Sequence, residues 1–178
     1  MRIQRVIGFA GWSGAGKTVL ITRLIPHLAA SGITVSTIKH AHHAFDIDKP
    51  GKDSYEHRQA GATQVLISSA HRWALMNELR GAPEPDLTEL LAKLAPVDLV
   101  FVEGFKRTTP VKLEVHRPSL GKPLIAPDDP DVAAVASDVP VTLPPGIPNL
   151  ALDDIAAIAA FIVQHATEVR IGAPPKSD

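Results

Sequence analysis

The sequence contains no cysteine, and this absence alone excludes several kinds of chemistry. Disulfide bonds, thiolate zinc sites, iron–sulfur clusters and cysteine nucleophiles all need a sulfur atom that the chain does not supply. Aromatic residues are also scarce, at 4% of the 178 residues, which argues against stacking platforms for single-stranded nucleic acid. Any chemistry must therefore come from oxygen and nitrogen groups.

Neither sign of charge dominates, and no apolar run is long. Eighteen Lys and Arg residues against nineteen Asp and Glu residues give a net charge of -1, too little positive charge to grip duplex nucleic acid. The longest helix-like apolar stretch, Ile155–Val163, is far too short to cross a bilayer. Val6–Trp12 faintly resembles part of a signal peptide, but no Ala-x-Ala-type cleavage site follows. We expect a cytoplasmic protein with no nucleic-acid or membrane partner.

One motif indicates the chemistry. Gly11–Thr18 matches the phosphate-loop pattern G-x-x-x-x-G-K-[ST], with a predicted strand before it and a predicted helix after it. In such a loop the backbone N–H groups wrap a pyrophosphate, and glycines permit the dihedrals that this needs. We expect the Lys17 amine to bridge the β- and γ-phosphates, as a catalytic group, and the Thr18 hydroxyl to ligate Mg²⁺. The predicted nucleotide-binding residues of the loop are Gly11, Ser13, Gly14, Ala15, Gly16, Lys17 and Thr18.

Strand and helix patterns alternate along the chain, which predicts an α/β fold. We expect a single P-loop NTPase domain over residues 1–170, with a mostly parallel sheet, helices on both faces and an antiparallel edge hairpin, followed by a disordered tail over 171–178. Helices are predicted over Lys17–Ala30, Ser54–Ala60, Leu87–Leu94, which a capping box of Asp86 and Glu89 opens, and from Asp153 or Asp154 to about Thr167. Strands are predicted over Ile3–Ala10, Ile33–Lys39, Gln64–Ser68, Arg72–Met76, Val97–Val102, Val111–His116 (as an edge strand) and Val132–Ala136.

A P-loop protein also needs a carboxylate for Mg²⁺ at the carboxyl end of a buried strand. Asp98 and Glu103 flank the apolar run Leu99–Val102. Glu103 is the better candidate because it ends the strand, whereas Asp98 begins it. The alternative is that Glu103 is a solvated acid after a core strand.

A polar stretch crowded with histidine and aspartate follows the second predicted strand. It has three interpretations: a solvated loop, an active-site loop whose acids orient Mg²⁺ or the attacking water, and a transition-metal site. We favour the second interpretation and predict catalytic roles for Asp48 and Asp53. The residues concerned, within eighteen positions, are His40, His42, His43, Asp46, Asp48, Asp53 and His57.

Base choice is weakly encoded, because the Asn-Lys-x-Asp guanine reader of many GTPases is missing. Asp138 follows a short predicted strand, where an acid can accept from the N1–H and N2–H groups of guanine; the alternative is a turn acid before Pro140. Several cations lie near predicted loop ends and are either solubilising or able to stabilise a phosphoryl group in transfer: Lys39, Lys52, Arg58, Lys106 and Arg107.

Together with the phosphate loop, six short segments closely resemble the molybdopterin-guanine dinucleotide biosynthesis protein B (MobB) family. They are Ile38–His43, Phe45–Asp48, Pro50–Ser54, Ala60–Ala62, Val102–Lys106 and Lys112–Arg117. The resemblance implies a GTP-binding protein with weak GTPase activity, usually a homodimer. It further implies an accessory role beside the guanylyltransferase that attaches GMP to molybdopterin, and a magnesium role for Glu103.

The resemblance also lends weight to Asp46, Asp48, Asp53 and Lys106. The predicted edge strand at Val111–Arg117 is a candidate for dimer pairing. Two other functions compete with the adapter: a small-molecule kinase, which needs an Arg-rich lid that is not visible in the sequence, and a nucleotide-switched metallochaperone that uses His42 and His43.

Overall fold

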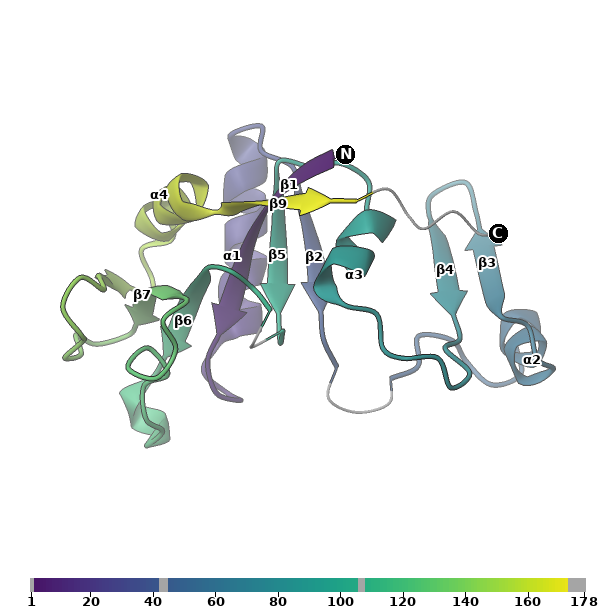
Figure 1. Ribbon diagram of the computed structural model, residues 1–178, viewed down its shortest axis with the longest axis horizontal. Helices are drawn as coiled ribbons and strands as arrows, with labels where there is room; N and C mark the ends of the chain where they lie inside the picture. Colours follow the sequence, from purple (N-terminus) through teal and green to yellow (C-terminus); the bar gives the residue numbers. More distant parts are fainter. Residues whose placement is uncertain (1, 42–44, 106–107, 173–178) are drawn as a thin grey trace. The chain divides into compact units, whose positions relative to one another are not determined.

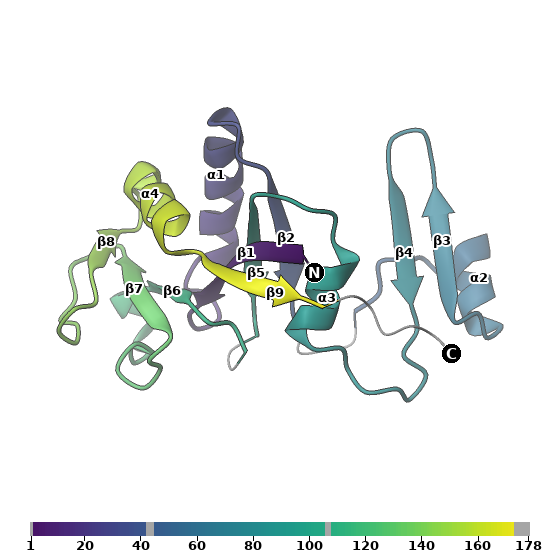
Figure 2. The ribbon, with the colours of Figure 1, turned by 45° about the horizontal axis from the view of Figure 1, so that its top comes forward.

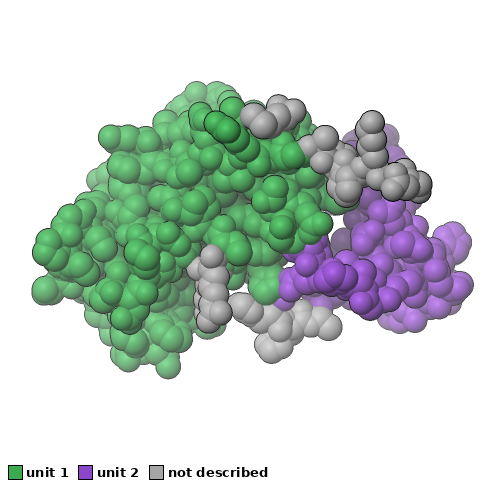
Figure 3. Space-filling model, in the orientation of Figure 1, with its two compact units in different colours: residues 1–40, 86–178 green, residues 41–85 purple. Residues whose placement is uncertain are grey.

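The chain folds into two compact units. The structure, a computed structural model, describes residues 2–41, 45–105 and 108–172. Unit 1 contains residues 1–40 and 86–178, and unit 2 is the continuous segment 41–85 (Figure 3). The phosphate loop therefore belongs to unit 1, whereas most of the histidine- and aspartate-rich stretch belongs to unit 2.

Unit 1 is built on a seven-stranded sheet with the order β2-β5-β1-β6-β7-β8, in which β9 pairs with the first half of β1 (Figure 1). Every pairing in that order is parallel, and β9 alone runs antiparallel to its neighbour. The predicted fold class is confirmed. The strands are β1 (Arg2–Ala10), β2 (Val35–Lys39), β5 (Leu99–Glu103), β6 (Lys112–His116), β7 (Val132–Ser137), β8 (Asn149–Ala151) and β9 (Thr167–Ile171).

Helices cover both faces of this sheet (Figures 1 and 2). α1 (Lys17–Ala30) and α4 (Ile155–His165) pack with Leu99 and Phe101 on one face, and α3 (Leu87–Lys93) packs with Val100 and Val102 on the other. Alternate side chains of β5 thus enter two separate cores, since successive strand residues point to opposite faces. This two-sided burial is why the sequence there is continuously apolar.

Unit 2 contains α2 (Asp53–Gln59) and an antiparallel hairpin of β3 (Gln64–Ser68) and β4 (Trp73–Asn77). The predicted antiparallel hairpin is present, and it forms a two-stranded sheet of its own. Leu66 faces Leu75 across the hairpin, and Trp73 lies next along the same face. All three side chains are exposed, so they form an apolar patch on this face that no described residue buries.

The prediction that Val111–His116 is an edge strand is wrong. β6 lies between β1 and β7 and hydrogen-bonds to both, and all five of its residues are buried. Its backbone is therefore not available to pair with a second copy of the chain, and the proposed dimer contact through this strand fails with it.

Internal partners for its polar side chains explain how β6 can be buried. The Lys112 amine contacts Asp129 at 2.8 Å and Asp131 at 3.2 Å. The fully buried Glu114 carboxylate accepts the backbone N–H groups of Ile125 and Ala126, both at 2.8 Å. Alternating polar and apolar residues predict an edge strand only when the polar ones reach water, and here they do not.

Two strands escaped prediction. β8 has only three residues and follows the irregular proline-rich segment 140–148, and β9 begins two residues after α4 ends, without a turn signal. Ile171, at the start of the expected disordered tail, is a buried residue of β9. Residues 173–178 lie outside the described residues.

We expect Glu114→Gln to lower the free energy of unfolding by about 1–3 kcal/mol, because an amide NH₂ group would face a backbone donor in a buried site. Urea unfolding followed by circular dichroism measures this change. The matched control is Glu168→Gln, at an exposed position of β9. Equal stabilities of the two variants would contradict the buried role of Glu114.

Candidate functional site

The phosphate loop joins β1 to α1 and has the backbone that its glycines predict. Gly11, Gly14 and Gly16 have φ angles of 137°, 84° and 101°, in the region that glycine adopts without a steric cost. A Cβ atom on Gly11 would lie 2.4 Å from the carbonyl oxygen of Val115. The loop therefore leaves β1 in close contact with β6, and no other residue type fits at its first position.

The helix that follows the loop begins without a side chain that caps its N-terminus. Gly16 is the N-cap of α1, makes no side-chain capping bond, and no acidic residue occupies the first turn. By contrast, Asp86 caps α3 through the predicted capping box with Glu89, and Asp154 caps α4. The unpaired N–H groups and positive dipole end of α1 therefore favour an anion supplied from outside the helix.

The Lys17 side chain folds across the loop. Its amine donates to the carbonyl of Gly11 at 2.8 Å and to that of Trp12 at 3.2 Å. Thr18 and Ser13 are exposed on the same segment. A flexible ammonium and a hydroxyl thus stand beside the uncapped helix start, which is the donor set that a triphosphate with Mg²⁺ requires.

The two acids that flank β5 lie at opposite ends of the strand, as predicted. Glu103 pairs in register with Phe9 and Lys39, near the start of the phosphate loop, and its carboxylate is 4.0 Å from the Lys39 amine. Asp98 lies at the other end, where it accepts the hydroxyl and backbone N–H of Thr34 at 2.6 and 2.7 Å. Only Glu103 of this pair stands at the edge where phosphates would lie.

Gly104 shows how closely the chain passes this edge. Its φ is 104°, and a Cβ atom there would lie 2.9 Å from the Cβ of His40. The backbone N–H of His40 donates to the Glu103 carbonyl at 2.8 Å, and its ring packs against Phe105 with 5.0 Å between centroids. Lys106 and Arg107, two of the candidate cations, lie outside the described residues, as do His42 and His43.

The candidate base reader Asp138 follows β7, at the same edge of the sheet. Its carboxylate accepts from the Arg117 guanidinium at 2.7 Å, and Arg117 also donates from Nε to the carbonyl of Ala15 in the phosphate loop at 3.1 Å. Sequence reasoning gave Arg117 no role. The available signal was its position directly after a predicted strand, where the side chains of an α/β site gather.

Trp12 is a second loop residue that sequence reasoning left without a role. Its indole N–H donates to the carbonyl of Pro123 at 2.8 Å, and the Lys122 amine lies 5.8 Å from the centre of its ring. Leu120 comes near Gly14, since a Cβ there would be 3.7 Å from the leucine side chain. The segment after β6 thus holds the outer side of the phosphate loop.

Three acids of unit 2 surround one arginine. Arg58 contacts Asp46 at 2.7 Å, Glu78 at 2.9 Å and Asp48 at 3.4 Å. These hydrogen bonds lower the pKa of Asp46, chiefly through Arg58, and hydrogen bonding to Asp46 and then Glu78 raises the pKa of Arg58. Asp48 also accepts the Ser54 hydroxyl at 2.9 Å. Arg58 is therefore an internal ion-pair partner in this unit.

Asp53, the first residue of α2, belongs to the same unit. The catalytic roles of Asp48 and Asp53 stay a prediction. Among the described side chains, no group of three or more histidines and acids is placed to hold a metal ion.

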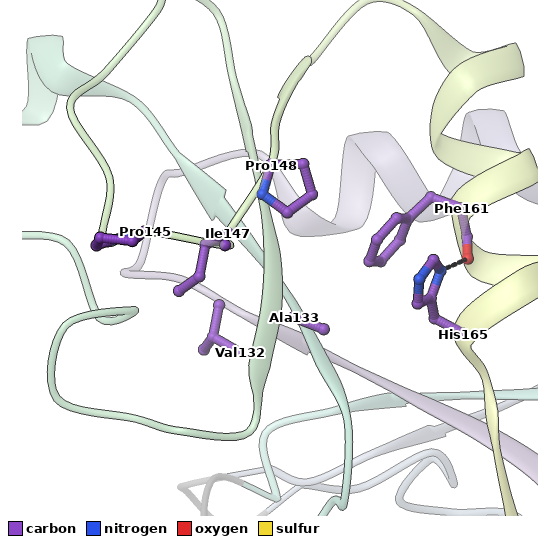
Figure 4. Close-up of a pocket in the computed structure, with 8 residues that line it drawn as sticks. Val132, Ala133, Pro145, Ile147, Pro148, Phe161 and His165 are labelled. Carbon is purple, nitrogen blue, oxygen red and sulfur yellow. Dashed lines mark hydrogen bonds between the residues drawn. The ribbon is translucent and has the colours of Figure 1, made fainter.

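A separate open groove lies at the start of β7, the opposite end of that strand from Asp138 (Figure 4). Its volume is about 830 Å³, and Figure 4 shows Phe161 and His165 of α4 on one side and the proline-rich segment on the other. The His165 ring stacks on Phe161 and its Nδ1 lies 2.9 Å from the Phe161 carbonyl. The His165 side chain thus interacts within its own helix.

In the described part of the chain no helix has the length and hydropathy of a membrane span.

Comparison with known proteins gives consistent findings. A family model described as molybdopterin guanine dinucleotide synthesis protein B matches residues 6–138. The molybdopterin-guanine dinucleotide biosynthesis adapter protein of Escherichia coli K12 is 45% identical over 162 residues, covering 89% of this chain and 91% of that protein. The adapter protein of the same description from Haemophilus influenzae is 41% identical over 160 residues, covering 88% and 86%.

Solved structures agree with the fold. A crystal structure of molybdopterin-guanine biosynthesis protein B superposes with a TM-score of 0.69 at 26% identity, covering 89% of this chain and 98% of that chain. The crystal structure of Bacillus subtilis MobB gives a TM-score of 0.70 at 22% identity, covering 92% and 98%, and it supports the fold alone.

The Asp98 carboxyl group makes the free energy of unfolding depend on pH. The Thr34 hydroxyl and then the Thr34 N–H lower the pKa of Asp98 below its ordinary value of 3.8. The folded protein therefore favours the carboxylate, so this contribution is complete above about pH 4 and is lost as pH falls through the lowered pKa. We expect the free energy of unfolding to drop less between pH 5 and pH 2 in Asp98→Asn than in wild type. Thr34→Val, which removes one donor, should fall between them, and three identical pH profiles would contradict the prediction.

Proposed function

Because this chain belongs to the molybdopterin guanine dinucleotide synthesis protein B family, we propose that it is the GTP-binding adapter of molybdopterin guanine dinucleotide synthesis. The family places the chain in molybdenum cofactor biosynthesis. The observation that supports nucleotide binding most strongly is the uncapped start of α1 behind a loop of left-handed glycines. Residues 1–170 form the proposed nucleotide-binding domain, with unit 2 as a segment within it.

The phosphate site fits a triphosphate residue by residue. Loop N–H groups would face the β-phosphate, and the Lys17 amine would exchange its two loop carbonyls for phosphate oxygens, which are better partners for an ammonium. Such an exchange needs only rotation of a flexible side chain. The bound state then gains a charge-assisted interaction at small cost to the loop.

The donor set also fits Mg²⁺. The Thr18 hydroxyl and the Glu103 carboxylate are hard oxygen ligands on the two segments that leave β1 and β5. Glutamate reaches one methylene further than the usual aspartate, so contact through a water molecule suits it. When bound, Mg²⁺ neutralises the charge of the β- and γ-phosphates and supports slow hydrolysis of GTP to GDP and phosphate.

The kinase and metallochaperone alternatives are not favoured. Family membership supports the adapter role, and the sequence shows no Arg-rich lid of the kind that a small-molecule kinase closes over its substrates. The proposed partners are the guanylyltransferase and other proteins of the pathway, in the cytoplasm.

A homodimer is part of the proposal, with a different contact from the one that the sequence predicted. The exposed hairpin face of Leu66, Trp73 and Leu75 is an uncovered apolar surface on a two-stranded sheet. The other face of the hairpin is already packed, since Val65 and Met76 are buried, whereas exposed apolar patches of this kind mark interaction sites.

GTP binding depends on Lys17 and on one of the two β5 acids. We expect Lys17→Ala to lower the affinity for GTP at least about tenfold and to abolish GTP hydrolysis, because a charged hydrogen-bond donor is lost. The fold should be kept. Calorimetric titration and phosphate release measure these two effects. Wild-type turnover in Lys17→Ala would overturn the assignment of this loop.

The flanking acids provide a matched pair for Mg²⁺. Glu103→Gln should lose the gain in GTP affinity that Mg²⁺ gives, because an amide is a poor magnesium ligand. Asp98→Asn, at the far end of the same strand, should keep that gain. A Glu103→Gln protein that responds to Mg²⁺ as wild type does would remove Glu103 from the metal site.

The oligomeric state tests the hairpin. We expect wild-type protein to be a dimer by light scattering, and the double change Leu66→Ser with Leu75→Ser to give a monomer, since it removes the apolar surface. Val139→Ser, an exposed position of unit 1, is the control and should leave the dimer intact. A dimer that survives the double change would move the interface elsewhere.

A further inference from the structure

Three neighbouring parallel strands bring the phosphate loop, Arg117 and Asp138 to one edge of the sheet. β6 lies between β1 and β7, and His116 pairs in register with Ser137. Arg117 directly follows the end of β6 and Asp138 directly follows the end of β7, so the two residues leave the sheet at the same level. The phosphate loop leaves β1 on the other side of Arg117.

Arg117 makes bonds in both directions. Nε donates to the Ala15 carbonyl of the loop at 3.1 Å, and Nη1 donates to Oδ2 of Asp138 at 2.7 Å. Because the guanidinium is planar and rigid, two bonds from one group fix its two partners relative to each other. A lysine amine, which is a point donor on a flexible stem, cannot do the same.

The bonds leave the binding surfaces themselves open. Arg117 bonds a carbonyl of the loop, so it competes for none of the loop N–H donors that an anion would need. On Asp138, the guanidinium bonds Oδ2, and each carboxylate oxygen has two acceptor positions, so Oδ1 and the second lone pair of Oδ2 could accept the two N–H groups of a guanine.

We propose that Arg117 is a positioning residue that holds the phosphate loop and the base-reading carboxylate of Asp138 in one frame, and thereby sets guanine specificity without touching the base. The inference rests on the proposed function, because it assumes that GTP binds at this edge, and it further assumes that the guanine lies against Asp138, as the sequence predicts. Its consequence is that one residue influences recognition at both ends of the nucleotide.

Three ligands distinguish the effect of Arg117 on the base end of the nucleotide site from its effect on the phosphate end. GTP uses both, ITP lacks the 2-amino group that an Asp138 carboxylate would bind, and inorganic tripolyphosphate has no base. In Arg117→Met we expect the GTP-over-ITP affinity ratio to fall toward one and tripolyphosphate to bind about threefold to tenfold more weakly. In Arg117→Lys, the ratio should fall as well, although the positive charge is kept. Arg170→Met, on β9 opposite Ile3 and at the other end of β1, should behave as wild type.

Calorimetry at constant salt with Mg²⁺ gives every affinity, and circular dichroism reports folding. A wild-type ratio and tripolyphosphate affinity in folded Arg117→Met would overturn the inference, and so would full rescue by lysine, which would leave only a charge effect. If Arg117→Met does not fold, the GTP-over-ITP affinity ratio of Arg117→Lys tests the inference in its place. Wild-type protein that binds neither GTP nor tripolyphosphate would instead overturn the proposed function.

Discussion

The positive end of α1 is the constraint on which the site depends. A helix start leaves N–H groups that must find acceptors, and in α3 and α4 the chain supplies an aspartate for this purpose. At α1 it supplies a glycine and no acid. The loop is also pinned by the contact between Gly11 and the Val115 carbonyl, so the uncapped end cannot relax freely. This arrangement costs local stability that the proposed anion would return on binding.

The parallel sheet explains why the site residues converge. Strands β5, β1, β6 and β7 end at one edge, where the candidate site residues lie: Glu103 is the last residue of β5, and the phosphate loop, Arg117 and Asp138 follow β1, β6 and β7. Such a convergence is the general property of α/β sheets that bind ligands beyond the carboxyl ends of their strands. Because β6 lies between β1 and β7, its polar side chains are buried, and each of them needs a partner inside the protein.

Local rules in the sequence predict the parts of the structure that depend on local contacts. Gly11–Thr18, the fourth-residue repeat of Leu20, Leu24 and Leu28, and the Asp86–Glu89 capping box follow from spacing alone, and the structure has them. The relation between strands escaped prediction. The internal place of β6 depends on the connection between β6 and β7, which folds back and supplies partners for its polar side chains: Ile125, Ala126, Asp129 and Asp131. The bond from Arg117 to Ala15, 102 positions apart, is likewise a product of topology.

Backbone amide shifts on titration with Mg·GTP test the central claim most directly, because they report the donors themselves. We expect large shifts at the amides of Gly14, Gly16 and Lys17, and none at Phe161 and His165 beside the groove at the far end of β7. A spectrum in which these loop amides stay unchanged while other regions respond would contradict it.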